Sequence, residues 1–297
     1  MPPRIPREDE SKQMRFGGVS LSRCSGSKNE RLQDSGPFGR LVAALEPWLD
    51  QVVIVGGWAH QLYRLHPHAQ ELDYPPLTTL DTDVAVPAEM PVGEQDIRAR
   101  LLAHGFTEEF LGDDHPPATH YRLGGEASGF YAEFLTPLVG SAYDRKHKRK
   151  ATMEVAGIAS QQLRHIELLL HQPWSINLES DRFVARLQIS NPVSFLAQKI
   201  LIHQKRDRED RAKDLLYLHD TLEVFGARLP ELQELWRDIV APQLQPRSVG
   251  TVSKASEVLF GELSDDIRRA AEISDERALS PGAIKEACRY GFIQVFG

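Results

Sequence analysis

Three short patterns between residues 52 and 87 constrain the fold more than any other part of the sequence. An apolar, β-branched run ends in Gly56-Gly57, a helical pattern follows, and a proline-rich connection leads to the segment TTLDTDVAVP. Short β-branched runs that end in glycine are typical of buried strands that enter tight turns. Side chains alternate along a strand, so the second segment predicts Asp81 and Asp83 on one face of a strand. Both carboxylates can then reach one site.

Two carboxylates at alternate positions of one strand suit phosphoryl transfer. Transfer from a nucleoside triphosphate needs divalent cations that bridge the phosphates, and two cations can clamp the attacking and leaving oxygens. Magnesium prefers oxygen ligands and keeps several waters, which matches a sparse carboxylate site. Gly56 and Gly57 would let backbone N–H groups, and the N-terminus of the next helix, approach the phosphates.

Each half of this pattern also has an ordinary explanation. Asp81 and Asp83 alone could form the solvent face of an edge strand, and the two glycines could be a common turn. Paired aspartates between apolar residues are unusual on exposed strands, so the combination favours a site. A Rossmann dinucleotide site fits poorly, because the sequence GWAHQ that follows Gly56 lacks the spaced glycines of that motif.

The remaining patterns predict an α+β unit followed by helices. Helical periodicity begins at Phe38 and returns over residues 94–105, and a further helix is expected from about Ala159 to His171. Strands are expected in the segments THYRLGG, FYAEFLTPL, TMEVAGI and FVARLQI. From Asn191 the pattern becomes helical. We predict a disordered tail that lacks a burying face, a mixed-sheet core and a helical domain, over residues 1–36, 37–190 and 191–297.

Composition limits the partners that the protein can have. Lys and Arg total 35 against 42 Asp and Glu, a net charge of -7, which argues against a chain-wide basic surface for duplex DNA. The basic run at residues 144–150 is more simply a solvated turn. Cys24 and Cys288 form no ligand spacing, and no apolar run approaches the ~20 residues that span a bilayer. We therefore expect a cytoplasmic protein without a membrane segment.

The glycine turn and the aspartate strand resemble the signature of the DNA polymerase β-like nucleotidyltransferase superfamily. In that signature a Gly-Gly or Gly-Ser turn precedes a strand of the pattern hDhDh, where h is hydrophobic, and Gly56, Gly57, Asp81 and Asp83 match it. The segments VGGWAHQLYRLHP, PPLTTLDTDVAVP, THYRLGG and FYAEFLTPLVGS look more narrowly like a bacterial family of nucleotidyltransferase-fold proteins. This resemblance covers roughly residues 50–220. It implies a polymerase β-like fold and suggests the chemistry of that superfamily.

The resemblance also implies further site residues. The superfamily usually adds a third carboxylate from a neighbouring strand, and Glu133 in FYAEFLTPL is the candidate. Glu133 would complete the metal site or take the proton from the attacking hydroxyl; alternatively, it is an exposed strand residue. Its side chain is longer than the aspartate usual at this position. The nucleotide-binding residues that we expect are Gly56, Gly57, Trp58 and Lys199.

Lys199 lies in an otherwise apolar helical segment, FLAQKILIHQ. A buried ammonium there would need a partner such as a phosphate or a carboxylate. Alternatively, the side chain extends along the helix to solvent. Nucleotidyltransferase toxins of the superfamily carry a Lys and a Lys-Asp or Arg-Asp element on later helices, and Lys199 and Lys213-Asp214 are similar to these.

The sequence therefore predicts an enzyme that transfers a nucleoside monophosphate from an NTP to an acceptor and releases pyrophosphate. Asp81, Asp83 and Glu133 would be its catalytic and metal-binding residues, with Mg²⁺ or Mn²⁺ as the cofactor. The acceptor could be an RNA, a protein or a small molecule. One alternative is a binding or regulatory module of the same fold without catalysis. Another is the toxin of a toxin–antitoxin pair, which would have an antitoxin partner.

Overall fold

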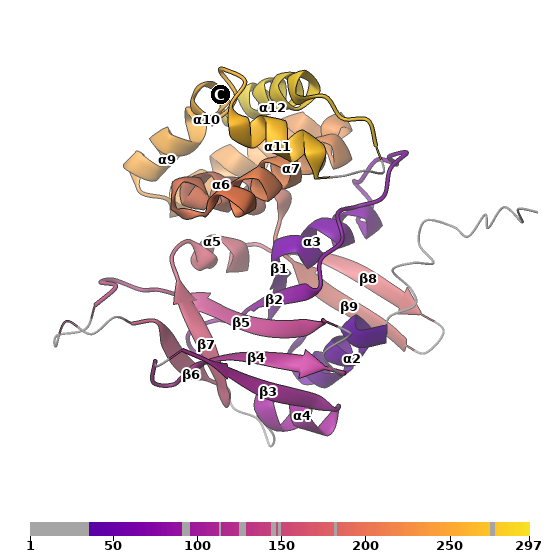
Figure 1. Ribbon diagram of the computed structural model, residues 1–297, viewed down its shortest axis with the longest axis vertical. Coiled ribbons are helices and arrows are strands. Elements are labelled where there is room, and N and C mark those ends of the chain that lie inside the picture. Colours follow the sequence, from indigo (N-terminus) through magenta and orange to yellow (C-terminus); the bar gives the residue numbers. More distant parts are fainter. Residues whose placement is uncertain are drawn as a thin grey trace, which may run out of the picture.

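The computed structural model describes residues 36–90, 96–112, 114–124, 129–143, 147, 150–180, 183–273 and 277–297. A mixed sheet forms one part of the molecule, and the C-terminal helices gather over one side of it (Figure 1). The predicted tail, residues 1–36, lies outside the described residues except for Gly36, where the first described helix begins. None of the described helices is both long enough and apolar enough to cross a membrane.

Within the described part of the chain the sheet has nine strands, and their order places the aspartate strand near its centre. The order is β3-β4-β5-β2-β1-β9-β8, and β7 pairs with both β5 and β6. The strands are β1 (Val53–Val55), β2 (Asp81–Ala85), β3 (Phe106–Leu111), β4 (Ala118–Leu123), β5 (Tyr131–Pro137), β6 (Thr152–Val155), β7 (Ile158–Leu163), β8 (Trp174–Ser180) and β9 (Phe183–Ile189). β2 runs antiparallel to β1 and parallel to β5.

Helices cover the sheet and then form the C-terminal part. The helices near the sheet are α2 (Gly36–Leu45), α3 (Gly56–Leu62), α4 (Ile97–Ala103) and α5 (Ile166–Leu170), and those of the C-terminal part are α6 (Pro192–Ile202), α7 (Arg208–Val224), α8 (Leu229–Leu235), α9 (Pro246–Ser253), α10 (Ala255–Val258), α11 (Asp265–Glu272) and α12 (Pro281–Phe296). Helix starts are stabilised by side-chain caps, among them Asn191 on α6 and Asp207 on α7. In Figure 1, α3 and α5 lie between the strands and the C-terminal helices, and they contact α7 and α6 respectively.

Apolar packing runs through both parts of the molecule. The main cluster of buried residues contains Phe38 of α2, Ile54 of β1 and Phe296 of α12, so the sheet and the C-terminal helices share it. A smaller cluster packs β1, β2 and β5 against α5. The last strand ends at Ile189 and α6 begins at Pro192. The division into domains near residue 190 stays a prediction, because the shared cluster joins the two parts.

The helix expected from Ala159 to His171 is wrong over its first half. Residues Ile158–Leu163 form strand β7, which makes a hairpin with β6, and only Ile166–Leu170 are helical. The turn consists of Ala156 and Gly157, whose φ angles are 47° and 82°. Two consecutive positive φ angles are what a two-residue hairpin turn requires, and they reverse the chain inside the segment TMEVAGI that we expected to be one strand.

Two strands besides β7, namely β3 and β8, were also absent from the sequence prediction. β3 and β8 are the end strands of the principal strand order. β3 has the sequence FTEEFL, and only its first residue, Phe106, is fully buried. A strand that buries one end and exposes polar side chains has no clear apolar alternation, so periodicity alone does not detect it.

Candidate active site

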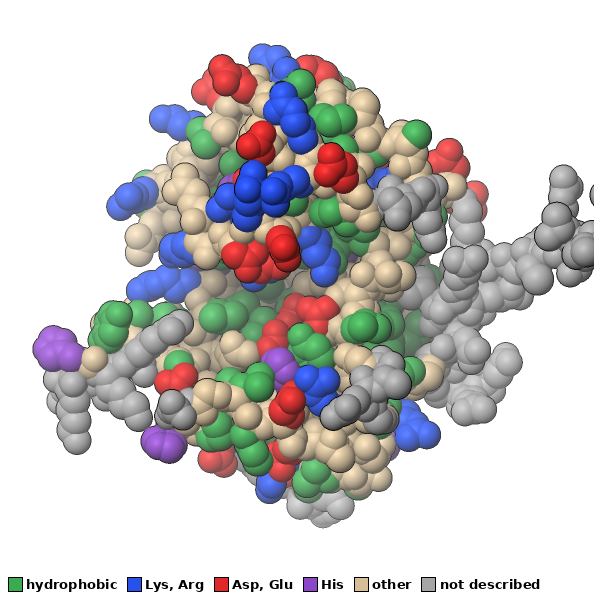
Figure 2. All heavy atoms as spheres, viewed as in Figure 1, with side chains coloured by type: hydrophobic (Ala, Val, Ile, Leu, Met, Phe, Trp, Pro, Cys, Tyr) green, Lys and Arg blue, Asp and Glu red, His purple; other side chains and the backbone are tan. Residues whose placement is uncertain are grey.

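The parallel pairing of β2 with β5 brings two of the predicted carboxylates together. In this register Asp83 lies opposite Glu133, and Asp81 lies opposite Tyr131. All three acidic side chains keep partial exposure, whereas Thr82 and Val84 on the other face of β2 are buried. Figure 2 shows acidic side chains gathered in a hollow of the surface, at the boundary between the sheet and the C-terminal helices.

Gly56 packs directly against the Asp83 carboxylate. Its φ angle is +62°, which side chains with a Cβ rarely adopt, and a Cβ at this position would overlap the Asp83 carboxylate oxygen. α3 begins at Gly56 itself, so the helix N-terminus faces the carboxylates without an intervening turn. The chain therefore needs glycine here for its backbone angle and for the space that Asp83 occupies.

The negative charges around Asp83 outweigh the positive charge that reaches it. Burial raises the pKa of Asp83 well above its usual range, and the neighbouring Glu133 adds to the increase through its charge and a hydrogen bond. The Asp81 carboxylate raises the pKa further, and only partial compensation comes from Lys199, which lowers it. In the absence of a cation, Asp83 therefore holds a proton more tightly than an ordinary aspartate.

Glu133 is held as an ionised carboxylate by its neighbours. The Gln161 side chain donates a hydrogen bond to Glu133 Oε2 at 2.7 Å, and His120 Nε2 lies 3.3 Å from the same oxygen. Burial by itself would raise the pKa of Glu133. Hydrogen bonds outweigh burial, first that from His120, and the pKa lies below its usual range. The two facing carboxyl groups thus shift in opposite directions: the pKa of Asp83 is raised and that of Glu133 is lowered.

Asp81 is oriented by a residue just before its own strand. The hydroxyl of Thr79 donates a hydrogen bond to Asp81 Oδ1. The negative charge of Asp81 reaches the neighbouring pair, because it raises the pKa of Asp83. Like charges that share a site repel one another in the absence of a cation.

A family model described as nucleotidyltransferase matches residues 33–241, which is more than two thirds of the chain. The chain belongs to this nucleotidyltransferase family. No curated protein matches it. The mixed sheet flanked by helices, followed by a helical C-terminal region, is the fold that the resemblance led us to expect. The protein is therefore an enzyme of the class that transfers nucleoside monophosphates.

In this nucleotidyltransferase, Lys199 is buried and paired with a carboxylate. Its Nζ lies 2.6 Å from Asp214 Oδ1, and both side chains are at least nine-tenths buried. Of the two sequence interpretations, a buried ammonium with a partner is the one that the structure shows. Lys199 also acts on the pKa of Asp83, so its charge reaches the carboxylate site. Its role in binding the nucleotide stays a prediction.

Trp58 packs within the protein. Its ring stacks on Phe38 of α2, with centroids 3.9 Å apart and planes 6° from parallel, and its edge contacts Phe130. The indole Nε1 is buried without a hydrogen-bond partner among the described residues. Trp58 therefore joins α3 to α2, and the nucleotide contact that we expected from it stays a prediction.

Sequence reasoning missed four polar residues around the carboxylates: Thr79, His120, Gln161 and Tyr217. His120 and Gln161 come from β4 and β7, which border β5, so only the sheet register places them beside Glu133. Apart from His147 and Lys150, the basic run at residues 144–150 lies outside the described residues.

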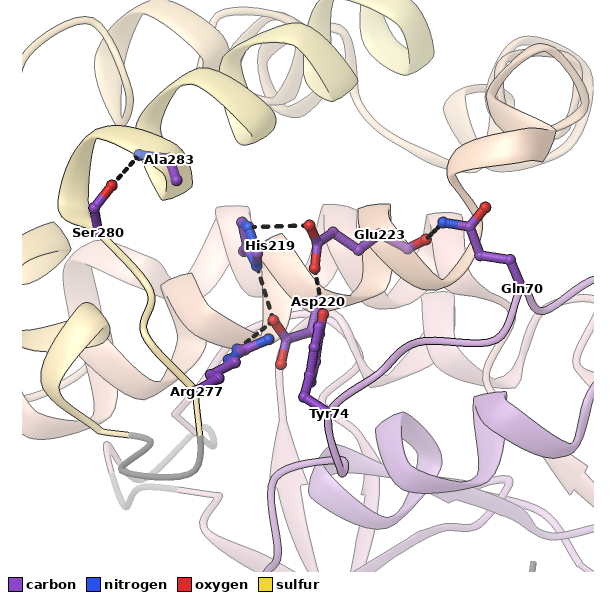
Figure 3. Close-up of polar contacts among 8 residues, drawn as sticks. All are labelled: Gln70, Tyr74, His219, Asp220, Glu223, Arg277, Ser280 and Ala283. Carbon is purple, nitrogen blue, oxygen red and sulfur yellow. Dashed lines mark hydrogen bonds and ion pairs between the residues drawn. The ribbon is translucent and has the colours of Figure 1, made fainter. Parts of the chain in front are cut away.

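A second polar cluster lies on α7. Among the described residues, His219, Asp220 and Glu223 are the one group whose ligand atoms are close enough together to hold a metal ion. Figure 3 shows that Arg277 points at Asp220 and Tyr74 at Glu223. The guanidinium of Arg277 lies 2.6 Å from Asp220 Oδ1 and already compensates that carboxylate.

A divalent cation would have to displace the Arg277 ion pair, whose two side chains are at least nine-tenths buried. The cluster instead ties three distant segments together. Gln70 and Tyr74 bond to Glu223 from the connection that precedes β2, and Arg277 reaches Asp220 from the segment before α12. We therefore interpret this cluster as structural and keep the β2–β5 carboxylates as the candidate active site.

Proposed function

We propose that this nucleotidyltransferase transfers a nucleoside monophosphate from an NTP to a hydroxyl acceptor in a reaction that depends on Mg²⁺ or Mn²⁺. The observation that carries the proposal is the pairing of Asp83 with Glu133 across β2 and β5, against Gly56 at the start of α3. This places carboxylates beside a helix N-terminus, where phosphate oxygens are favourably bound.

The chemistry of the donors fits a divalent cation, although the ligand atoms of Asp81, Asp83 and Glu133 do not all lie within 4.8 Å of one another as those of the α7 cluster do. The donors are carboxylate oxygens, which Mg²⁺ and Mn²⁺ prefer. The raised pKa of Asp83 supports the fit, because burial and the charges of Glu133 and Asp81 leave the site with uncompensated negative charge. Asp83 and Glu133, which lie opposite each other, would hold the cation together with Asp81 once the three carboxylates close around it. A bound cation would neutralise charge on the phosphates and favour departure of pyrophosphate.

The protein's own groups position the reactants. Gly56 and Gly57 offer backbone N–H groups at the start of α3 to the β and γ phosphates. Gln161 and His120 fix the direction of Glu133, which either completes the cation site or accepts the proton of the attacking hydroxyl. Lys199 adds positive charge from α6, close enough to lower the pKa of Asp83.

The test is incubation of the purified protein with each α-labelled NTP, Mg²⁺ or Mn²⁺, and RNA, protein or small-molecule acceptors in separate reactions. We expect label to appear in one acceptor class with wild type and to be lost with Asp83→Asn. Absence of both NTP binding and label transfer in wild type would contradict the proposal.

A melting-temperature measurement on the same preparation distinguishes an enzyme from a module that only binds NTP. If an NTP raises the melting temperature in a metal-dependent way but no acceptor is labelled, the non-catalytic alternative gains support. A ligand at 100 times its dissociation constant should stabilise the protein by about 2.7 kcal/mol, so binding is readily detected. A role as a toxin would require growth arrest on expression, relieved by the product of a neighbouring gene.

A further inference from the structure

Tyr217 of α7 has a buried hydroxyl that finds no partner in the described part of the chain. The residue is 3% exposed, and its hydroxyl oxygen makes no hydrogen bond among the described residues. His60 and Phe195 pack against its ring, with centroids 4.8 and 6.2 Å away. An unpaired buried hydroxyl reduces stability, so a phenylalanine would serve packing better. A group kept at a cost to stability calls for a functional explanation.

The hydroxyl of Tyr217 points toward the candidate active site. It lies 2.7 Å from the position that a Cβ on Gly57 would occupy, and the Thr79 methyl group is equally close to that position. Gly57 is therefore required by space, because Tyr217 and Thr79 fill the volume of any side chain. The Thr79 hydroxyl in turn donates to Asp81. Tyr217 and Thr79 thus both border Gly57 in the first turn of α3, and Thr79 connects this position to Asp81.

The charges around Tyr217 agree with this placement. Burial raises the pKa of the phenol, and Asp81 is the charged group with the largest further effect, ahead of Asp214 and Asp83. The ammonium groups of Lys199 and Lys213 lie 5.4 and 5.7 Å from the ring centroid. Burial thus keeps the hydroxyl a neutral donor, and Asp81 is the carboxylate whose charge acts on it most.

We propose that Tyr217 is a positioning residue for the cation site: its hydroxyl, together with Thr79, fixes the direction of the Asp81 carboxylate when a divalent cation is bound. The inference rests on the proposed function, because it assumes that Asp81 binds a cation. Carboxylates that ligate metals are oriented by outer hydrogen bonds, and removing such a partner weakens metal affinity about 10–100-fold. Through Tyr217, the C-terminal helices would take part in cation binding.

The experiment compares Tyr217→Phe with Tyr63→Phe. Tyr63 is also fully buried, but its hydroxyl donates to the backbone oxygen of Ser190 at 2.9 Å, remote in sequence from the carboxylates. Mn²⁺ affinity is measured by titration without nucleotide, and thermal unfolding is measured without metal. We expect Tyr217→Phe to bind Mn²⁺ about 10-fold more weakly with an unchanged or higher melting temperature. Tyr63→Phe should melt earlier and bind Mn²⁺ like wild type.

A second pair of variants tests Thr79, whose hydroxyl donates a hydrogen bond to Asp81. Thr79→Val removes the hydroxyl and should weaken Mn²⁺ binding, whereas Thr79→Ser keeps the hydroxyl and should retain affinity. Wild-type Mn²⁺ affinity in Tyr217→Phe would overturn the inference while leaving the proposed function intact. Equal loss of affinity in both tyrosine variants would assign the effect to packing and would also overturn it. No saturable Mn²⁺ binding in wild type would overturn the cation site and the inference together.

Discussion

Asp83 is the residue at which burial, charge and hydrogen bonding act in the same direction. Burial raises the pKa of Asp83 most. The charge and the hydrogen bond of Glu133 raise the pKa further, and so does the charge of Asp81. Because the folded state binds this proton more tightly than the unfolded chain does, the group contributes stability at low pH. That contribution is lost as the pH rises through the raised pKa.

Replacement of Asp83 by Asn should therefore stabilise the metal-free protein at neutral pH. Asparagine is nearly isosteric and removes the uncompensated charge, so we expect a higher melting temperature for the variant than for wild type at pH 7.5. The stability of wild type should fall from about pH 4 upward, and the variant should show a weaker decline. Thermal unfolding from pH 4 to 8 measures both.

The effect of Mn²⁺ on stability should differ between wild type and Asp83→Asn. Mn²⁺ should stabilise wild type and have little effect on the variant, since the variant lacks a charged ligand. If Asp83 were only a solvated strand residue, the substitution would change neither the pH dependence nor Mn²⁺ affinity.

Substitution of Gly56 tests its close contact with Asp83 of β2. Gly56→Ala forces a side chain into a positive-φ position and into the Asp83 carboxylate, whereas Gly140→Ala meets the same kind of φ angle, +76°, with no atom within 4 Å. The φ strain should cost about 1–2 kcal/mol in each variant. Only Gly56→Ala should also displace Asp83 and lose Mn²⁺ and NTP binding, measured by titration. Equal binding in the two variants would contradict the proposed contact.

At the scale of elements, the Lys199–Asp214 ion pair joins α6 to α7. Lys199→Met would leave Asp214 as a buried carboxylate that keeps Arg206, at 3.4 Å, as its ion-pair partner among the residues that the structure describes. Removing one member of a buried pair costs about 3–5 kcal/mol, while replacing both with apolar residues is often neutral. We expect Lys199→Met to lose about 3 kcal/mol and the double variant with Asp214→Leu to recover most of it.

Chemical denaturation measures this double-mutant cycle, with Lys205→Met as the control because Lys205 is exposed on the adjacent turn. If Lys199→Met and Lys205→Met lost the same stability, the ion pair would have no role in joining the helices. NTP affinity of the stable double variant then tests the nucleotide-binding role of Lys199 separately from folding.

At the scale of the whole molecule, one apolar cluster extends from α2 to α12. α2 contributes Phe38, Leu41 and Leu45 to it, and each is at most 3% exposed. The described packing therefore begins immediately after the predicted tail, residues 1–36, and includes the first helix.

A chain that starts at Gly36 should keep the melting temperature of the full-length protein within a few degrees, because none of the described packing is removed. A chain that starts at Glu46 lacks α2 and should lose cooperative melting or melt far earlier, since several buried apolar side chains are missing. Scanning calorimetry of both truncations measures this. Early melting of the chain that starts at Gly36 would show that the tail packs on the core.

The sequence by itself determined the arrangement around β1, α3 and β2. Strand alternation and glycine conformation act over a few residues, so Asp81, Asp83, Gly56 and Gly57 could be placed from local patterns, and Glu133 followed from a resemblance. The β6–β7 hairpin escaped detection because its turn, Ala156-Gly157, lacks the Asn-Gly or Asp-Gly pair that usually marks one.

Only the tertiary structure decided which groups surround these carboxylates. His120 and Gln161 reach Glu133 because β4 and β7 border β5, and Tyr217 reaches Gly57 because α7 packs against α3. The partner of Lys199 likewise comes from a different helix. Such contacts join residues far apart in the chain and depend on strand order, register and helix packing, which periodicity within a single segment does not specify.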